Sequence, residues 1–224
     1  IKPLQALPFV GAGGLAHFGW GVDETALLCA SHSGEAAHLA VVGRMLDGCG
    51  VSSAALGCGA HVPISYAALS TLPPADACWT ALHNNCSGKH TGFLAYCRWR
   101  GWSLDDYLDF AHPLQAEIRQ AISEFANIDA AALPWGIDGC SAPNYALPLS
   151  ALAYAYARLA AGAPGTPFGG AATGLRDAMR ERPQLISGVG RADLQLAQAG
   201  CGDWIAKVGA DGVRTKDGVK MEML

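Results

Sequence analysis

The sequence has no long hydrophobic run and no cluster of basic residues. Residues 150–163 form the most apolar stretch, but Arg158 interrupts it, and a membrane-spanning helix needs about 20 apolar residues. The 15 Lys and Arg residues are scattered, and the formal net charge is −4. These absences argue against a membrane protein and against nucleic acid or an anionic membrane surface as a partner. A small neutral or zwitterionic ligand remains compatible with this charge.

Paired cysteine motifs are also missing. The chain has eight cysteines, and no two of them are spaced as C-x-x-C. Only 15% of the residues are charged and 51% are hydrophobic, so 224 residues are enough to bury a large core without a disulfide framework. We therefore expect reduced thiols, most of them buried, in a cytoplasmic protein that forms a single domain over residues 1–224.

The most informative stretch is residues 84–90, with the sequence NNCSGKH. An apolar helical pattern follows it to Arg100, and Asn and Ser before such a pattern are typical of a helix N-terminus. The positive end of the helix dipole lowers the pKa of a nearby thiol. One turn separates Cys86 from Lys89, so the two side chains share a helix face. This arrangement is compatible with a site, and equally with a capped helix that buries Cys86 and exposes Lys89.

The remaining pattern predicts an α+β fold. Ser33 is the expected N-cap of a helix that carries Leu39, Val42 and Leu46 on one face. Further helices are predicted over residues 1–10, 86–100, 103–106, from 113, 148–161, 172–182 and 193–199, and strands over 16–20, 25–30 and 204–208. A hairpin at residues 21–24 would join the first two strands. We expect the terminal strands to pair in one mixed sheet beside a helical lobe.

Ser31 lies where the predicted strand changes into a helix, a common place for a reactive hydroxyl and a more common place for a capping serine. Serine alone is a weak nucleophile at neutral pH, but a neutral lysine within hydrogen-bond reach can remove its proton. Pairs of Ser and Lys are used for acyl transfer from amides. Ser31 with Lys207 or with Lys2 is therefore the candidate catalytic pair.

A zinc site is a second candidate, although the spacing of its residues is weak evidence. The Gly-rich loop over residues 136–143 holds Asp138 and Cys140, neither of which has an evident structural task. Cys140 and Cys86 together with a nitrogen donor would hold Zn²⁺ with one position open. The nitrogen would come from Lys89 as a neutral amine or from His90, whose other interpretation is a core histidine.

Seven short segments occur in an order that resembles the L-asparaginase II family of Rhizobium type. They are KPLQ at 2–5, SHSGE at 31–35, CGAH at 58–61, NCSGKH at 85–90, GIDGC at 136–140, GVGR at 188–191 and AKVGADGV at 206–213. The resemblance spans essentially the whole chain. It implies a fold related to serine β-lactamases and glutaminases, a homodimer, and hydrolysis of L-asparagine to L-aspartate and ammonia with two Ser–Lys pairs.

Residue by residue, the resemblance assigns Lys2 to the family's Ser-x-x-Lys, and Ser31 and Lys207 to the second pair. It implies that zinc is held by Cys86, Lys89 and Cys140. The candidate substrate-binding residues are Glu35, Asp138 and His90, with Glu35 or Asp138 facing the ammonium group of the substrate.

Two departures from the family pattern qualify this assignment. The serine of Ser-x-x-Lys and an arginine beside it would precede Ile1, and the end of the chain over residues 214–224 is short for the family. We expect segments beyond both termini, although a truncated and inactive protein would show the same sequence. The alternatives are another Ser–Lys amidase (a glutaminase, or a β-lactam or peptide hydrolase), an inactive zinc- or amino-acid-binding homologue, and a protein in which these thiols and lysines are purely structural.

Overall fold

The computed structural model of the protein describes residues 1–209 and 214–216 and is mostly helical. The helices are α1 (Lys2–Gly11), α2 (Gly14–Phe18), α3 (Val22–Cys29), α4 (Ala36–Cys49), α5 (Ile64–Ala68), α6 (Ser87–Arg100), α7 (Pro113–Ala126), α8 (Leu149–Ala160), α9 (Gly169–Glu181), α10 (Pro183–Ile186) and α11 (Ala192–Ala199). Three short 3₁₀ turns cover Ser53–Ala55, Ala81–His83 and Ala130–Ala132. No helix in these residues is long and apolar enough to cross a membrane.

Four short strands form two separate antiparallel pairs in the described part of the chain. Strand β1 (Trp135–Ile137) pairs with β2 (Pro143–Tyr145), and β3 (Ala206–Val208) pairs with β4 (Arg214–Lys216). The helical and strand content agrees with an α+β class. The single mixed sheet that we expected is not found among the described residues, because its N-terminal strands are helices.

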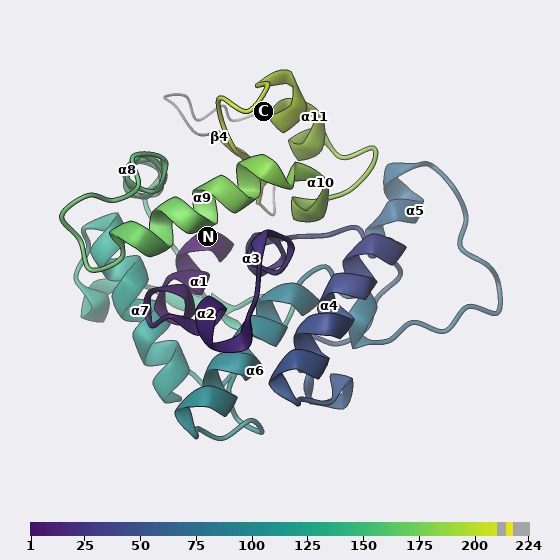
Figure 1. The fold of residues 1–224 in the computed structure, drawn as a ribbon, viewed down its shortest axis with the longest axis horizontal. Coiled ribbons are helices and arrows are strands. Elements are labelled where there is room, and N and C mark those ends of the chain that lie inside the picture. The colour runs from purple at the N-terminus through teal and green to yellow at the C-terminus, as the bar shows by residue number, and fades with distance from the viewer. Residues whose placement is uncertain (210–213, 217–224) are drawn as a thin grey trace.

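Helix α3 lies at the centre of the molecule, with α9 on one side and α6 on the other (Figure 1). All residues from Thr25 to Cys29 are buried. Figure 1 also shows α5 and the segment after it extending away from the other helices. The N-terminus of α3 is tied to neighbouring helices by ion pairs of Asp23 and Glu24, and its C-terminus leads through Ala30 to Ser31.

The strands predicted over residues 16–20 and 25–30 are wrong, because residues 16–18 belong to α2 and residues 25–29 to α3. A short apolar run that is buried on all sides has the same composition in a helix as in a strand. Capping hydrogen bonds at the N-terminus of α3 favour the helix. The Gly21 amide donates to Glu24 Oε2 at 3.0 Å, and Thr25 Oγ1 donates to the Gly21 carbonyl at 2.7 Å. The expected hairpin is therefore the start of α3.

Two predicted helix starts also differ. Helix α4 begins after Glu35 rather than after Ser33, and the Glu35 amide donates to His38 Nδ1 at 3.1 Å. Ser33 lies in an extended segment before it, with its amide bonded to the Ser187 carbonyl. No helix forms at residues 103–106, where Ser103 Oγ accepts from the Asp105 amide in a turn.

The prediction of α7 is confirmed in detail. Pro113 occupies its first turn, and the His112 ring caps it by accepting from the Leu114 amide at 3.1 Å. The stripe of apolar residues at helical spacing is buried in the core: Leu114, Ile118, Ile122 and Phe125. This helix packs against α1 and so holds Lys2 in the interior.

A glycine in the NNCSGKH segment allows α6 to pack against α3. A Cβ atom on Gly88 would lie 2.4 Å from the Leu27 carbonyl oxygen, which is a backbone atom that cannot move aside cheaply. Gly88 lies between Cys86 and Lys89, so this close packing also brings both side chains to the C-terminal end of α3. The helices can meet at this distance only where the side chain is absent.

We expect Gly88→Ala to destabilise the protein by about 1–3 kcal/mol, because the two helices must separate to admit the methyl group. Gly43→Ala in α4 is the matched control: nothing lies within 4 Å of its Cβ position, so loss of glycine's flexibility should stabilise the protein by about 0.5–1 kcal/mol. Urea unfolding of both variants measures these changes. Equal stability of the two variants would contradict the role assigned to Gly88.

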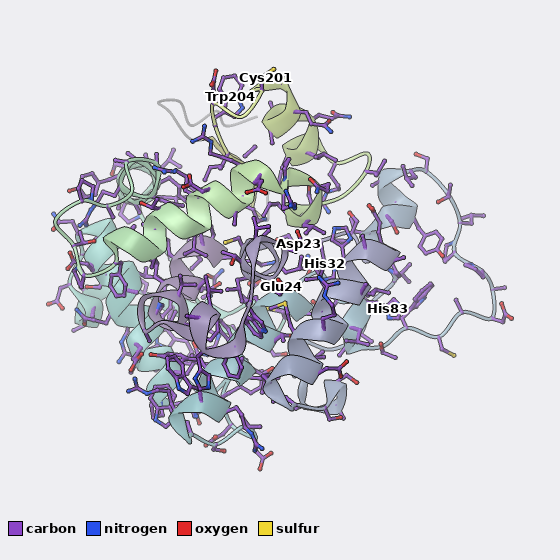
Figure 2. The ribbon with its side chains drawn as sticks, in the orientation of Figure 1. Asp23, Glu24, His32, His83, Cys201 and Trp204 are labelled. Carbon is purple, nitrogen blue, oxygen red and sulfur yellow. The ribbon has the colours of Figure 1, made fainter. Side chains whose placement is uncertain are left out.

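The prediction of mostly buried, reduced cysteines is confirmed for the thiols themselves. All eight are free, and only Cys78 and Cys201 are exposed. Cys201 lies beside Trp204 at the edge of the molecule, far from the interior position of His32 (Figure 2).

Candidate active site

The hydroxyl of Ser31 lies between two lysine amines. Lys2 Nζ is 2.7 Å from Ser31 Oγ, and Lys207 Nζ is 2.8 Å from the same atom. The three side chains come from α1, from the segment after α3, and from β3, so 205 residues of sequence separate the two lysines. Both alternative pairings considered from the sequence therefore form at the same serine.

The backbone around Ser31 is held from two sides. Its amide donates to the Ile186 carbonyl, and the next amide, that of His32, donates to the Asn85 carbonyl. The His32 ring reinforces this connection, because Nδ1 accepts from the Gly34 amide and Nε2 therefore donates to Ser87 Oγ at 2.8 Å. Figure 2 shows His32 in the interior beside α4. Burial lowers the pKa of this ring well below its ordinary value, so it remains neutral.

Burial also changes the protonation of the two lysines. It is the main reason that the pKa of Lys207 falls to about 7, and the charge of Lys2 lowers it further while Asp193 partly opposes the change. The pKa of Lys2 is likewise lowered by burial, but the sulfur of Cys86 attracts its charge and opposes the shift. Lys207 is therefore the amine that loses its proton near neutral pH, while the Cys86 thiolate favours the charged form of Lys2.

The two cysteines and the lysine expected to bind zinc also converge. Lys89 Nζ donates to Cys140 Sγ at 3.1 Å, and the Cys140 thiol is hydrogen-bonded to the Cys86 sulfur. Cys86 precedes α6, and Cys140 lies in the loop of the β1–β2 hairpin, so the pairing of Ile137 with Pro143 brings this loop to the helix start. In the described chain, no three side chains of the His, Cys, Asp or Glu types are grouped for metal binding. A metal held here would need the lysine as its third ligand.

Cys86, Lys89 and Cys140 share protons through their hydrogen bonds. Hydrogen bonding from Cys140 lowers the pKa of Cys86 to about 4, and the cations of Lys2 and Lys89 contribute to the same change. The hydrogen bond to Cys86 raises the pKa of Cys140 in return. Burial would lower the pKa of Lys89, but attraction to the two sulfurs outweighs burial and leaves the pKa raised. The cluster is thus a thiolate, a thiol and an ammonium group.

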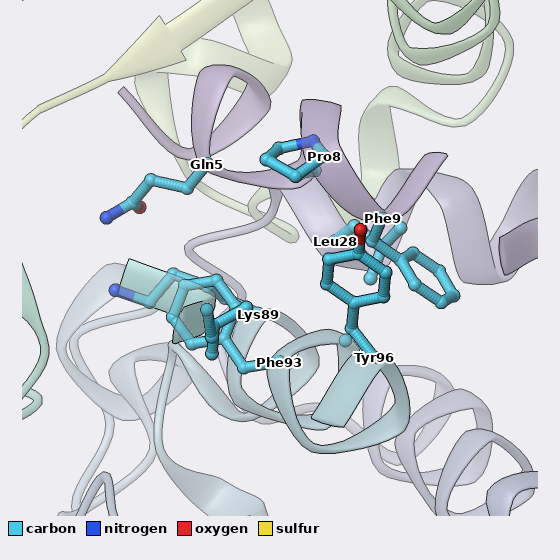
Figure 3. A pocket seen from close by; sticks show the side chains of 10 residues that line it. Gln5, Pro8, Phe9, Leu28, Lys89, Phe93 and Tyr96 are labelled. Atoms are coloured by element: carbon cyan, nitrogen blue, oxygen red, sulfur yellow. The ribbon is translucent and has the colours of Figure 1, made fainter. Parts of the chain in front are cut away.

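A small apolar cavity of about 10 Å³ lies behind Lys89. Phe9, Phe93 and Tyr96 are among the residues that line it, and Figure 3 shows the Lys89 amine at the end of the cavity away from Phe9 and Tyr96. The amine lies 5.7 Å from the centre of the Phe93 ring. This apolar wall holds the aliphatic part of Lys89 and leaves its amine facing the cysteines.

A much larger cleft of about 570 Å³ opens over Ser31. Six of the nine residues predicted from the sequence to form the site line this cleft: Lys2, Ser31, Cys86, Asp138, Cys140 and Lys207. Lys89 reaches Cys140 from behind. The cleft is large enough for a small ligand and combines a hydroxyl, amines, thiols and a carboxylate.

Glu35 and His90 do not line this cleft in the described structure. Glu35 Oε1 accepts from the Val189 amide at 2.8 Å, so its carboxylate connects α4 to the turn after α10. His90 is fully buried, its Nδ1 is bonded to the Tyr107 hydroxyl at 2.6 Å, and burial lowers the pKa of its ring. Of the two acidic residues considered for the ammonium group, Asp138 is the one at the cleft.

His61, Asn144 and Arg191 are among the lining residues to which the sequence analysis assigned no role. His61 Nε2 accepts from the Asn85 amide at 3.0 Å, next to Cys86. The side-chain oxygen of Asn144 is buried without a partner among the described residues. His61 and Arg191 end the CGAH and GVGR segments, so a sequence signal existed for them, whereas nothing marked Asn144.

The comparison with protein families agrees with this geometry. The sequence profile of the family described as L-asparaginase II matches residues 1–221. The chain belongs to the L-asparaginase II family. A comparison with curated proteins gave no match. Membership of the L-asparaginase II family supports an amidohydrolase that acts on a small molecule, and the match over nearly the whole chain confirms the resemblance seen in the seven segments.

Proposed function

We propose that this protein hydrolyses the side-chain amide of L-asparagine to give L-aspartate and ammonia. The observation that carries the proposal is the position of Ser31 Oγ, within 2.8 Å of two buried amines at the floor of the cleft. Family membership supports the amide as the substrate bond. The most direct test is ammonia release from L-asparagine by the full-length gene product.

The reaction begins with proton transfer from Ser31 Oγ to the neutral amine of Lys207. The hydroxyl oxygen then attacks the amide carbon and forms a tetrahedral intermediate. Lys207 returns the proton to the amide nitrogen, the carbon–nitrogen bond breaks, and ammonia leaves an aspartyl ester on Ser31. Water, activated by the same amine, hydrolyses this ester to aspartate. Lys2 donates hydrogen bonds beside Ser31 and would stabilise the negative charge that develops on the amide carbonyl oxygen.

Zn²⁺ fits the donor set of Cys86, Lys89 and Cys140, because two sulfurs and one amine already meet there. When bound, Zn²⁺ would orient the substrate or polarise an oxygen of a bound molecule. The chain's own contribution is to hold the two sulfurs next to each other at the cleft and to place Asp138 beside them. The serine β-lactamase-like fold and the homodimer stay predictions from the family resemblance.

A substrate panel separates this proposal from its closest alternatives. L-Glutamine, a β-lactam and an asparagine-containing peptide test for a glutaminase, a β-lactam hydrolase and a peptidase. Preference for L-asparagine over all three supports the proposal. Peptide mass mapping after rapid quenching should find the aspartyl ester on the peptide that contains Ser31, and an ester found only elsewhere would contradict its role as the nucleophile.

The pKa of Lys207 predicts the pH dependence of the reaction. The amine acts as a base only when it is neutral, and its pKa is lowered to about 7, so kcat/KM should be low in acid, rise through about pH 7 and then level off. Initial rates across this range measure the profile. Lys207→Arg should be inactive throughout, because a guanidinium keeps its proton at every working pH. An activity that is independent of pH between 6 and 8, about one unit either side of that value, would contradict Lys207 as the base.

A further inference from the structure

One charged residue of the cleft has no function in the reaction described above. Arg191 lines the cleft together with Ser31, Lys207 and Asp138. The lysines of the site are already engaged, because Lys2 and Lys207 contact Ser31 and Lys89 contacts Cys140. Arg191 is thus the cation at the cleft that faces neither the serine nor the sulfurs.

One nitrogen of the Arg191 guanidinium lacks a hydrogen-bond acceptor among the described residues. Its Nη1 atom is buried and forms no hydrogen bond within the described chain. Arg191 forms an ion pair with Asp193, but Nε is 4.0 Å from Oδ1, which is too long for a hydrogen bond, and Asp193 Oδ1 is likewise buried without a hydrogen-bond partner among the described residues. Asp193 Oδ2 instead accepts from the Val208 amide at 3.4 Å. A buried charged donor without an acceptor is costly, and native proteins nearly always pair such a group.

The backbone fixes the direction of Arg191. Arg191 is the last residue of the turn between α10 and α11. Figure 1 shows this turn on the same side of the molecule as β4. Gly188 and Gly190 in this turn have φ values of +130° and +78°, and a Cβ on Gly190 would lie 2.9 Å from the Ala68 carbonyl oxygen. Only glycine adopts these φ values without strain and fits this close contact. The tight packing of the turn therefore holds the backbone of Arg191 in one position.

We infer that Arg191 binds the α-carboxylate of the amino-acid substrate. This inference rests on the proposed function and specifies its substrate class: a free α-amino acid with an unmodified carboxyl group. An amino acid needs a cation for its carboxylate and an anion for its ammonium group, and the cleft offers Arg191 and Asp138 for these tasks. Arginine suits a carboxylate because it remains charged and offers two parallel N–H donors.

A selectivity consequence follows from this assignment. A ligand whose α-carboxyl group is an amide leaves the guanidinium without its anion, so the site should select against it. L-Asparagine amide and peptides that continue beyond asparagine should therefore be poor substrates. This discrimination between a free and an amidated α-carboxyl group does not depend on the side-chain amide, because the side-chain amide reacts with Ser31 beside the two lysines.

The test compares Arg191→Met with the wild type in the full-length protein. For L-asparagine, KM should rise roughly 10- to 100-fold with little change in kcat, as expected for loss of a hydrogen-bonded charge pair. For L-asparagine amide, kcat/KM should stay unchanged, so the preference between the two substrates is lost. Calorimetry with L-aspartate should show the same weakening without any reaction. Arg191→Lys should recover part of the affinity, because it keeps the charge but not the paired donors.

Arg44→Met is the matched control, since Arg44 is exposed and pairs with Glu24 far from the cleft. It should leave both substrates unaffected. The inference is overturned if Arg191→Met changes both substrates equally, or changes neither. Equal losses of thermal stability in Arg191→Met and Asp193→Asn, with selectivity retained, would show that these residues only pair with each other. If the wild type binds L-aspartate through Arg191 but releases no ammonia from asparagine, the inference stands and the proposed function fails.

Discussion

Replacing Ser31 with alanine should lower kcat for asparagine hydrolysis by at least about 1,000-fold. The variant removes the hydroxyl oxygen that both Lys2 and Lys207 contact, at 2.7 and 2.8 Å. KM should change little, because the carboxylate and ammonium groups of the substrate are bound elsewhere in the cleft. Steady-state rates of ammonia release measure the effect.

Ser33→Ala is the control for Ser31→Ala. Ser33 lies two residues further along the same extended segment, is fully buried, and its hydroxyl has no hydrogen-bond partner in the described part of the chain. The substitution should keep activity within a few-fold of the wild type. Near-normal turnover by Ser31→Ala would remove Ser31 from the chemistry, whereas a severe loss in both variants would point to a distorted segment.

Replacing Cys140 with serine should remove stoichiometric zinc from the purified protein and raise KM by roughly 10-fold or more, with a smaller effect on kcat. The variant takes away one of the two sulfurs and also the acceptor of the Lys89 amine. A serine hydroxyl keeps its proton at neutral pH and is a poor ligand for Zn²⁺. Metal analysis and steady-state kinetics on the same preparation measure both effects.

Cys97→Ser provides the comparison for Cys140→Ser. Cys97 is also fully buried and lies on α6, the helix of Lys89, but it does not line the cleft. It should keep the wild-type zinc content. Unchanged zinc content in Cys140→Ser would rule out the assigned ligands, and loss of zinc in both variants would assign the effect to the helix rather than to the sulfur.

The sequence predicted which residues meet at the cleft better than it predicted the secondary structure around them. Ser31, Lys2 and Lys207 could be chosen because hydroxyl and amine groups stand in short polar segments, and chemical identity is visible in a sequence. The residues alone could not decide between Lys2 and Lys207 as the partner of Ser31, and only the family resemblance paired Ser31 with Lys207, because the choice depends on how far burial lowers the pKa of each amine. That quantity arises from packing and from the neighbouring Cys86 and Asp193.

The errors in secondary structure arose where tertiary contacts, which a sequence does not show, determine the local structure. Residues 25–30 were predicted as a strand because an apolar run without polar interruption suits a buried strand as well as a helix enclosed on all sides. The start of α4 was predicted at Ser33 because serine is a favourable N-cap. The Ser33 amide instead donates to the Ser187 carbonyl, which keeps Ser33 in the extended segment before the helix. The regular apolar stripe of α7 had no such competitor, and its prediction is confirmed.

The separation of Lys2 from Lys207 along the chain constrains how the enzyme can mature. The first turn of α1 and strand β3 must both dock before Ser31 has its two amines. A folding intermediate with its helical core already assembled but β3 still undocked would carry an inert hydroxyl. In the proposed mechanism, catalytic competence thus requires α1 and β3 to be docked at the same time, so it belongs to the completed fold and not to any single segment.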